Sequence, residues 1–177
     1  MPIYEFEGNR PVIDPSSYIH PQSIIIGKVE IGKRCYIGAG AVIRGDLGKI
    51  VIGDGSAIEE NCVIHSGPDS IAIIEEDVIV GHAAVIHGPC LIKSQVTIGM
   101  GAIVSSQCEM ESTTFLGAGS VLPPGRSVPR GKLAVGNPAR VVKDLDEKLI
   151  AYNRKATKTY QDLVSRYINS LVQIGPP

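Results

Sequence analysis

The sequence has no tryptophan, only two phenylalanines and a net charge of −1 over 177 residues. With so few large rings, and with 20 glycines, it suits a thin core that holds no bulky side chains. The near-neutral charge gives no electrostatic basis for binding nucleic acid or an acidic membrane surface. No apolar run reaches the roughly 18 residues of a membrane span, and no N-terminal stretch resembles a signal peptide. We therefore expect one domain in the cytoplasm that binds neither nucleic acid nor a membrane.

A hydrophobic residue recurs at every sixth position along most of the chain. A six-residue repeat is typical of a parallel β-helix, in which each hexad forms one short flat strand and a corner. An antiparallel sheet would instead show a period of two. Three hexads complete one coil, so residues roughly 18 positions apart stack on each other. The period does not decide the handedness of the helix. The longest unbroken run is Ile74, Val80, Ile86, Ile92, Ile98, Val104, Met110, Leu116, Leu122 and Val128.

The repeat is interrupted at two places, where Ile52 follows Ile43 by nine residues and Ile74 follows Ile64 by ten. The extra residues are polar or glycine-rich, so we expect them to bulge from one corner and to leave the stack intact. We call the three walls of the β-helix a, b and c. Stacking then places these residues on the walls: Ile43, Ile64 and Ile86 on a, Ile52 and Ile74 on b, Ile58 and Val80 on c.

The four cysteines occupy the same small, inward position of the hexad, which predicts buried thiols that serve packing. Cys90 and Cys108 should stack, so a disulfide between them is sterically conceivable, but without a secretory signal we expect reduced thiols. The other two cysteines are Cys35 and Cys62.

The repeat gives way to helical spacing from about Asp144, with Asp144 or Asp146 as the N-cap. We therefore divide the chain into a β-helix domain, residues 1–140, and a C-terminal helix, residues 141–177, that packs on it. About 27 helical residues span about 40 Å, which is long enough to follow all the coils. The apolar positions are Leu149, Tyr152, Ala156, Tyr160, Leu163, Tyr167 and Leu171.

Three histidines form a candidate metal site. His65 and His87 each directly follow an anchor of wall a and lie on adjacent coils, so their outward side chains can share one metal ion. His82 belongs to wall c and should not reach that metal within its own chain. In a cyclic trimer, wall a of one subunit meets wall c of the next, which gives an interfacial site. Three histidines and a water form the open ligand set of catalytic zinc.

Charged residues lie near these histidines. Arg44 is on wall a, one coil below His65, and Asp46 lies two residues further on. Glu59 is on wall c, one coil below His82. Such residues can pair across subunits and orient the ligands, or they can simply lock a trimer together.

With these residues in view, the chain resembles the γ-class carbonic anhydrase family of the hexapeptide-repeat superfamily over nearly its whole length. The opening residues 1–4 and the segment 159–163 look most like the branch that contains PaaY and CaiE. The matching motifs are Arg44-Gly45-Asp46, Asn61-Cys62-Val63-Ile64-His65, Gly81-His82-Ala83-Ala84-Val85-Ile86-His87-Gly88, Ile98-Gly99-Met100-Gly101-Ala102 and Val135-Gly136-Asn137-Pro138-Ala139-Arg140.

The resemblance implies a left-handed β-helix, a homotrimer, and zinc, with iron or cobalt as substitutes. His65 and His87 of one subunit and His82 of the next would hold the metal, and Arg44 and Asp46 would form the family's interfacial ion pair. The implied reaction is the reversible hydration of CO₂ to bicarbonate. Zinc would lower the pKa of its bound water from 15.7 to about 7 and so supply hydroxide.

The sequence departs from the family where the proton shuttle is expected. Leu47 stands where the best-known members carry glutamate, and the short second insertion holds one acid, Asp69. Glu59 replaces the usual glutamine. Glu59 and Tyr160 are our candidates for the missing shuttle, although spacing places neither at the site. We therefore expect weak or absent carbonic anhydrase activity unless another route carries the proton.

Three alternatives remain open. The same metal can serve a zinc-dependent thioesterase that acts on acyl-CoA, which the resemblance to PaaY suggests. Hexapeptide-repeat proteins are also commonly acyltransferases, although these generally use one histidine as a base without three metal ligands. Finally, zinc can hold a trimeric scaffold together without any catalysis.

Overall fold

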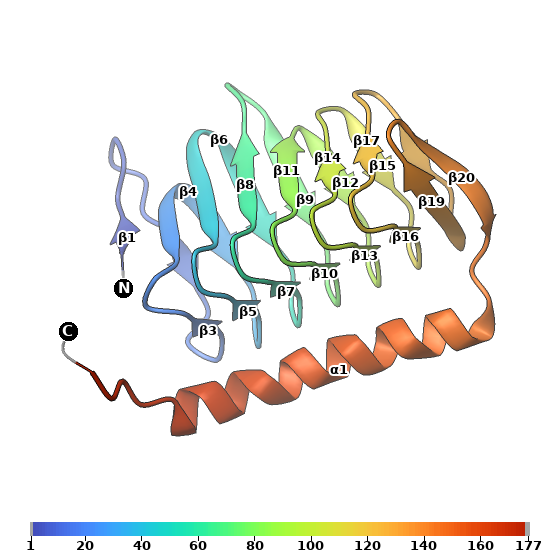
Figure 1. Ribbon diagram of the computed structural model, residues 1–177. Coiled ribbons are helices and arrows are strands. Elements are labelled where there is room, and N and C mark those ends of the chain that lie inside the picture. The colour runs from blue at the N-terminus through green and yellow to red at the C-terminus, as the bar shows by residue number, and fades with distance from the viewer. Residues whose placement is uncertain (1, 176–177) are drawn as a thin grey trace.

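The computed structural model describes residues 2–175, most of which wind into a parallel β-helix of stacked coils (Figure 1). The parallel β-helix with a C-terminal helix was the predicted fold and is confirmed. Its strands are β1 (Ile3–Tyr4), β2 (Val12–Ile13), β3 (Tyr18–Ile19), β4 (Ile24–Ile31), β5 (Tyr36–Ile37), β6 (Val42–Ile52), β7 (Ala57–Ile58), β8 (Val63–Ser66), β9 (Ile71–Ile74), β10 (Ile79–Val80), β11 (Val85–Gly88), β12 (Cys90–Ile92), β13 (Thr97–Ile98), β14 (Ile103–Val104), β15 (Cys108–Met110), β16 (Phe115–Leu116), β17 (Val121–Leu122), β18 (Ser127–Val128), β19 (Lys132–Gly136) and β20 (Ala139–Asp144).

The strand register confirms the assignment of residues to walls. Ile64 pairs with Ile43 on one side and with Ile86 on the other, so the strands of wall a stay in register despite the two insertions. Walls a and b form one sheet, because β4 and β6 run across the corner between them. Wall c is a separate sheet in which β3, β5, β7, β10, β13, β16 and β19 pair in parallel.

The inward anchors fill a narrow core that no solvent reaches. Ile43, Ile64 and Ile86 are all 0% exposed. The four cysteines are buried and free, as predicted, and Cys90 lies in register with Cys108. Burial raises the pKa of the Cys35 thiol to about 11, which leaves it protonated and unreactive at neutral pH.

The end of the β-helix differs from the sequence prediction. Residues 139–144, of which we assigned 141–144 to the helical segment, form β20, which turns back at Asn137-Pro138 and pairs antiparallel with β19. Pairing with β20 satisfies the backbone of β19, which would otherwise be an open sheet edge. The helix α1 (Glu147–Ser170) starts later, with Asp146 as its N-cap accepting a hydrogen bond from the backbone of Leu149. Of the two candidate caps, Asp146 is the one used.

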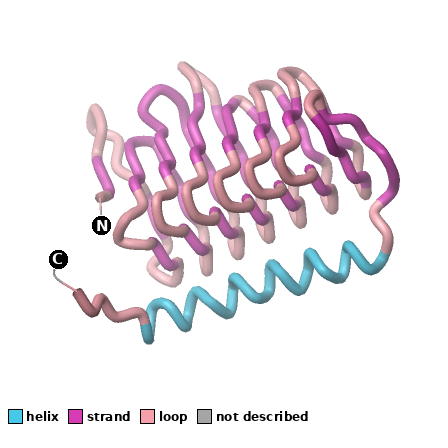
Figure 2. Tube along the Cα trace, in the orientation of Figure 1, coloured by secondary structure: helices cyan, strands magenta, loops and turns pink. Residues whose placement is uncertain are grey.

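The helix runs back along wall c toward the N-terminal coils (Figures 1 and 2). Its C-terminal half packs most closely, where Val164, Tyr160 and Tyr167 contact the buried rings of Tyr18 and Tyr36. Within the described residues, no helix is both long and apolar enough to cross a membrane.

Candidate functional site

Parallel pairing of β8 with β11 places His65 directly opposite His87 on wall a, as the stacking rule predicts. The Nδ1 atom of His65 lies 3.3 Å from the Nε2 atom of His87. The two rings meet edge to face, with centroids 5.1 Å apart.

This donor pair fits a tetrahedral zinc ion. Two zinc ligands at the usual Zn–N distance of about 2.05 Å are separated by about 3.3 Å in a tetrahedral site, which is the spacing that the two imidazoles adopt. Burial, aided by the positive charge of Arg44, lowers the pKa of His65. A lower pKa favours the neutral form of His65, which is the form that binds a metal.

The second nitrogen of each ring also has a partner. Asp46 Oδ1 lies 3.2 Å from His65 Nε2, and the hydroxyl of Ser106 lies 2.8 Å from His87 Nδ1. Such contacts fix the tautomer and the orientation of metal-binding histidines. Sequence reasoning missed Ser106, although it could have been found one coil and one residue beyond His87.

Asp46 is itself held by Arg44, whose guanidinium lies 2.6 Å from Asp46 Oδ2. Although burial raises the pKa of Asp46, the hydrogen bond and charge of Arg44 outweigh it and lower that pKa. Within one chain Arg44 pairs with Asp46, because both lie on β6. Gly45 between them allows close stacking, since a Cβ there would lie 2.6 Å from the Lys28 carbonyl oxygen.

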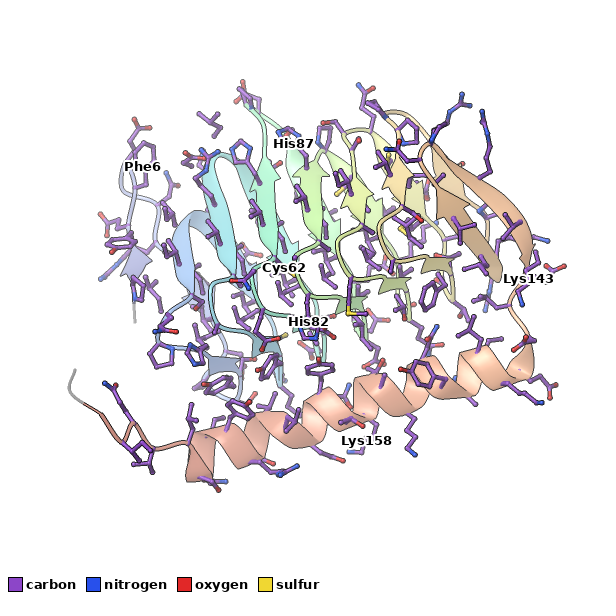
Figure 3. The ribbon with its side chains drawn as sticks, in the orientation of Figure 1. Phe6, Cys62, His82, His87, Lys143 and Lys158 are labelled. Atoms are coloured by element: carbon purple, nitrogen blue, oxygen red, sulfur yellow. The ribbon has the colours of Figure 1, made fainter. Side chains whose placement is uncertain are left out.

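His82 lies elsewhere, at the corner that follows β10. In Figure 3 it faces α1, whereas His87 lies near the far edge of the coils. Its Nε2 atom is 3.1 Å from Glu59 and its Nδ1 atom 2.6 Å from Glu60. Among residues 2–175, no three His, Cys, Asp or Glu side chains gather as metal ligands. Within one chain, two of the predicted ligands meet and the third does not.

Glu59 is nearly enclosed, at 5% exposure. Burial raises its pKa, although a hydrogen bond with Tyr160 and the nearby His82 oppose the shift. Tyr160, on α1, therefore lies next to Glu59, a contact that residue spacing did not predict. Burial and Glu59 raise the pKa of the Tyr160 phenol, so it remains a hydrogen-bond donor.

Glu60 is a second residue that sequence reasoning missed. One of its carboxylate oxygens contacts His82, and the other accepts a hydrogen bond of 2.8 Å from the buried Tyr36 hydroxyl. Glu60 therefore links His82 to the aromatic cluster beneath α1. Its position directly after Glu59 was the only sequence signal.

A groove of about 280 Å³ opens beside His82, between wall c and the N-terminal half of α1. It is mainly apolar, and it separates α1 from the outward side chains of β10, β13 and β16. Its lining includes Glu59, Ile79, His82, Met100, Phe115, Asn153, Ala156 and Tyr160.

Comparison with known proteins agrees with the repeat. A family model described as bacterial transferase hexapeptide (six repeats) matches residues 10–45. The carnitine operon protein CaiE of Shigella flexneri is 35% identical over 176 residues, covering 99% of this chain and 89% of that protein.

Two solved structures share the fold over almost the whole chain. A hexapeptide transferase family protein from Anaplasma phagocytophilum is 35% identical, with a TM-score of 0.90 over 94% of this chain and 98% of that one. The product of the BC4754 gene of Bacillus cereus, provisionally named an acetyltransferase, is 32% identical, with a TM-score of 0.93 over 96% of this chain and 98% of that one.

Proposed function

Because this chain belongs to the CaiE-like branch of the hexapeptide-repeat superfamily, we propose that it is a zinc-dependent enzyme that hydrolyses acyl-CoA thioesters at a site shared between subunits of a homotrimer. The observation that carries the proposal is the His65–His87 pair, whose facing nitrogens lie 3.3 Å apart while the other nitrogen of each ring contacts Asp46 or Ser106. A zinc ion bound there would supply a nucleophile at neutral pH by lowering the pKa of a bound water.

The remaining residues have distinct roles in this proposal. Asp46 and Ser106 orient the two rings, and Arg44 keeps Asp46 ionised. A second copy of the chain supplies His82, whose 45% exposed side chain can turn one nitrogen away from its carboxylate partners. Fe²⁺ or Co²⁺ can replace zinc in the same nitrogen ligand set.

Glu59 is the proposed proton acceptor. Hydrolysis of a thioester by water yields a carboxylate, a thiol and one proton, which must leave the site. The pKa of Glu59 is raised by burial, which favours a carboxyl group that can hold a proton beside His82. Tyr160 hydrogen-bonds to Glu59 and positions it.

Three observations favour a thioester over CO₂. The groove beside His82 is far larger than CO₂ requires. In addition, Leu47 is 47% exposed on β6 at the place where a shuttle glutamate is expected. Fast CO₂ hydration needs rapid proton export, so the absence of that glutamate should slow CO₂ hydration more than thioester hydrolysis. The Bacillus cereus relative is named for acetyl transfer, whose usual donor is a CoA thioester.

CO₂ hydration at the same site is the second candidate function. It is favoured by the group formed by Arg44, Asp46, His65 and His87, which matches the γ-carbonic anhydrase pattern; Arg44 contacts Asp46, and Asp46 contacts His65. The two reactions need the same three metal ligands. They differ in the size of the substrate that must fit beside the metal.

The test is to assay zinc-loaded protein for thiol release from acetyl-CoA and, by stopped flow, for CO₂ hydration. We expect thiol release that disappears in His87→Ala and persists in His20→Ala, a matched control outside the site. Thiol release that survives zinc removal and depends on an added amine or alcohol acceptor would instead identify an acyltransferase. About one zinc per chain, with neither reaction and with oligomer dissociation upon chelation, would identify a structural metal.

A further inference from the structure

Two carboxylates of the same chain contact the two ring nitrogens of His82. Glu59 Oε2 lies 3.1 Å from Nε2, and Glu60 Oε2 lies 2.6 Å from Nδ1. A metal-binding histidine gives one nitrogen to the metal and uses the other to fix its ring against a neighbouring acceptor. One of the two contacts therefore has to open before His82 can bind a metal, while the other one holds the ring.

The contact with Glu59 is the one that opens more easily. It is longer than the contact with Glu60, and charge-assisted hydrogen bonds strengthen as they shorten. Glu59 Oε2 also accepts a hydrogen bond of 3.0 Å from the backbone N–H of His82, and Tyr160 hydrogen-bonds to the same side chain. The buried Glu59 side chain therefore keeps two partners after Nε2 leaves it.

Glu60 is held from its other side by Tyr36. The Tyr36 hydroxyl donates a hydrogen bond of 2.8 Å to Glu60 Oε1, whereas Oε2 is the atom that contacts His82. Burial, together with this hydrogen bond, raises the pKa of Tyr36, so the phenol keeps the proton that it donates. The Tyr36 ring is only 3% exposed and packs against the rings of Tyr18 and Tyr160. A fixed donor thus sets the orientation of Glu60.

We propose that Tyr36 and Glu60 are positioning residues for the shared metal site, an inference that rests on the metal-binding part of the proposed function. Glu60 accepts a hydrogen bond from Nδ1–H of His82 and so leaves Nε2 without a proton, as the nitrogen offered to the metal. Tyr36 keeps Glu60 in place for this role. Because Tyr36 lies in the aromatic cluster under α1, docking of the helix orients a ligand that serves another subunit.

The first experiment measures the zinc affinity of the full-length protein by competition with a chelator. Tyr36→Phe removes only the hydroxyl and should weaken zinc affinity about three- to tenfold, the effect of one hydrogen bond. Tyr18→Phe is the matched control and should bind zinc as wild type does. It removes a buried hydroxyl from the ring stacked on Tyr36, and among the described residues that hydroxyl has no hydrogen-bond partner.

The same assay separates the two carboxylates. Glu60→Gln keeps the size of the side chain but removes its charge, and should weaken zinc affinity at least about tenfold. Glu59→Gln should not weaken zinc affinity, because its contact with Nε2 is the one that opens. A larger loss of affinity in Glu59→Gln than in Glu60→Gln would overturn the assignment.

The second experiment reads the His82 ring directly, by ¹⁵N NMR of the metal-free protein with labelled histidines in alkaline buffer, with His82→Gln to assign the signals. Wild type and Tyr18→Phe should carry the ring proton on Nδ1. Glu60→Gln and Tyr36→Phe should shift the population toward Nε2–H. A ring proton on Nε2 in wild type, or identical behaviour of Tyr36→Phe and Tyr18→Phe in both experiments, would overturn the assignment.

Metal affinity and turnover separate this inference from the proposed reaction. Zinc affinity that depends on Tyr36 and Glu60, without thiol release from acetyl-CoA, keeps the positioning role and refutes the reaction. Thiol release by a protein whose zinc affinity neither Tyr36→Phe nor Glu60→Gln changes keeps the reaction and refutes the positioning role. A wild-type protein that binds no zinc would refute both.

Discussion

Mixing two inactive variants should restore a defined fraction of zinc sites if His82 comes from a neighbouring subunit. The two variants are His65→Ala, which keeps His82, and His82→Ala, which keeps His65 and His87. An oligomer made of either variant alone lacks one histidine ligand at every metal site. Because His65 and His87 lie together on wall a while His82 lies on wall c, one mixed interface can contain all three ligands.

The size of the rescue follows from the arrangement. A complete site needs its wall a from a His82→Ala chain and its wall c from a His65→Ala chain. In a random one-to-one mixture each condition is met half of the time, so about one quarter of the sites are restored in any closed ring. If one chain supplied all three ligands, no site would be restored.

The assay is zinc content per chain after the two tagged variants are unfolded together, refolded and dialysed against a weak chelator, followed by thiol release from acetyl-CoA. A mixture of His65→Ala with His87→Ala is the control, because neither chain then offers an intact wall a. Native mass spectrometry shows whether mixed oligomers form. Mixed oligomers that bind no zinc, or rescue in the control mixture, would refute an interfacial site.

Three further predictions concern single residues. Ser106→Ala removes the hydroxyl that holds His87 and should weaken zinc affinity at least about tenfold in a chelator competition; unchanged affinity would show that the contact is incidental. Ile86→Ala leaves a cavity at a fully buried core position and should lower the free energy of unfolding by about 2–5 kcal/mol in urea, and a loss below about 1 kcal/mol would contradict the packing. Burial raises the pKa of Cys35 to about 11 and of Cys62 to about 12, so both thiols are protonated at pH 8 and form thiolate only as the pH approaches those values. A disulfide reagent should label neither at pH 8 until the protein is unfolded, and rapid labelling of the native protein would contradict this.

Only the tertiary structure decided which side chains contact the site histidines. The repeat places Ser106 one coil and one residue beyond His87, but the directions of the Ser106 and Glu60 side chains toward His87 and His82 depend on the folded corners. The hairpin of β19 with β20 was also missed, because its residues fall outside the hexad pattern and pair according to an edge that exists only in the folded stack. The groove under α1 depends likewise on how one helix lies on a wall.

The sequence by itself determined the coil register, the small buried thiols, the presence of a C-terminal helix with two candidate caps, and the meeting of His65 with His87. These follow from the hexad because every coil repeats the same inward and outward positions, so a spacing in the chain becomes a neighbour in space. The separation of His82 from that pair was predictable for the same reason. The repeat does not predict the contacts at the corners, the position of α1 on wall c or the contacts with a second copy of the chain. Packing between elements sets those contacts, and the six-residue period does not.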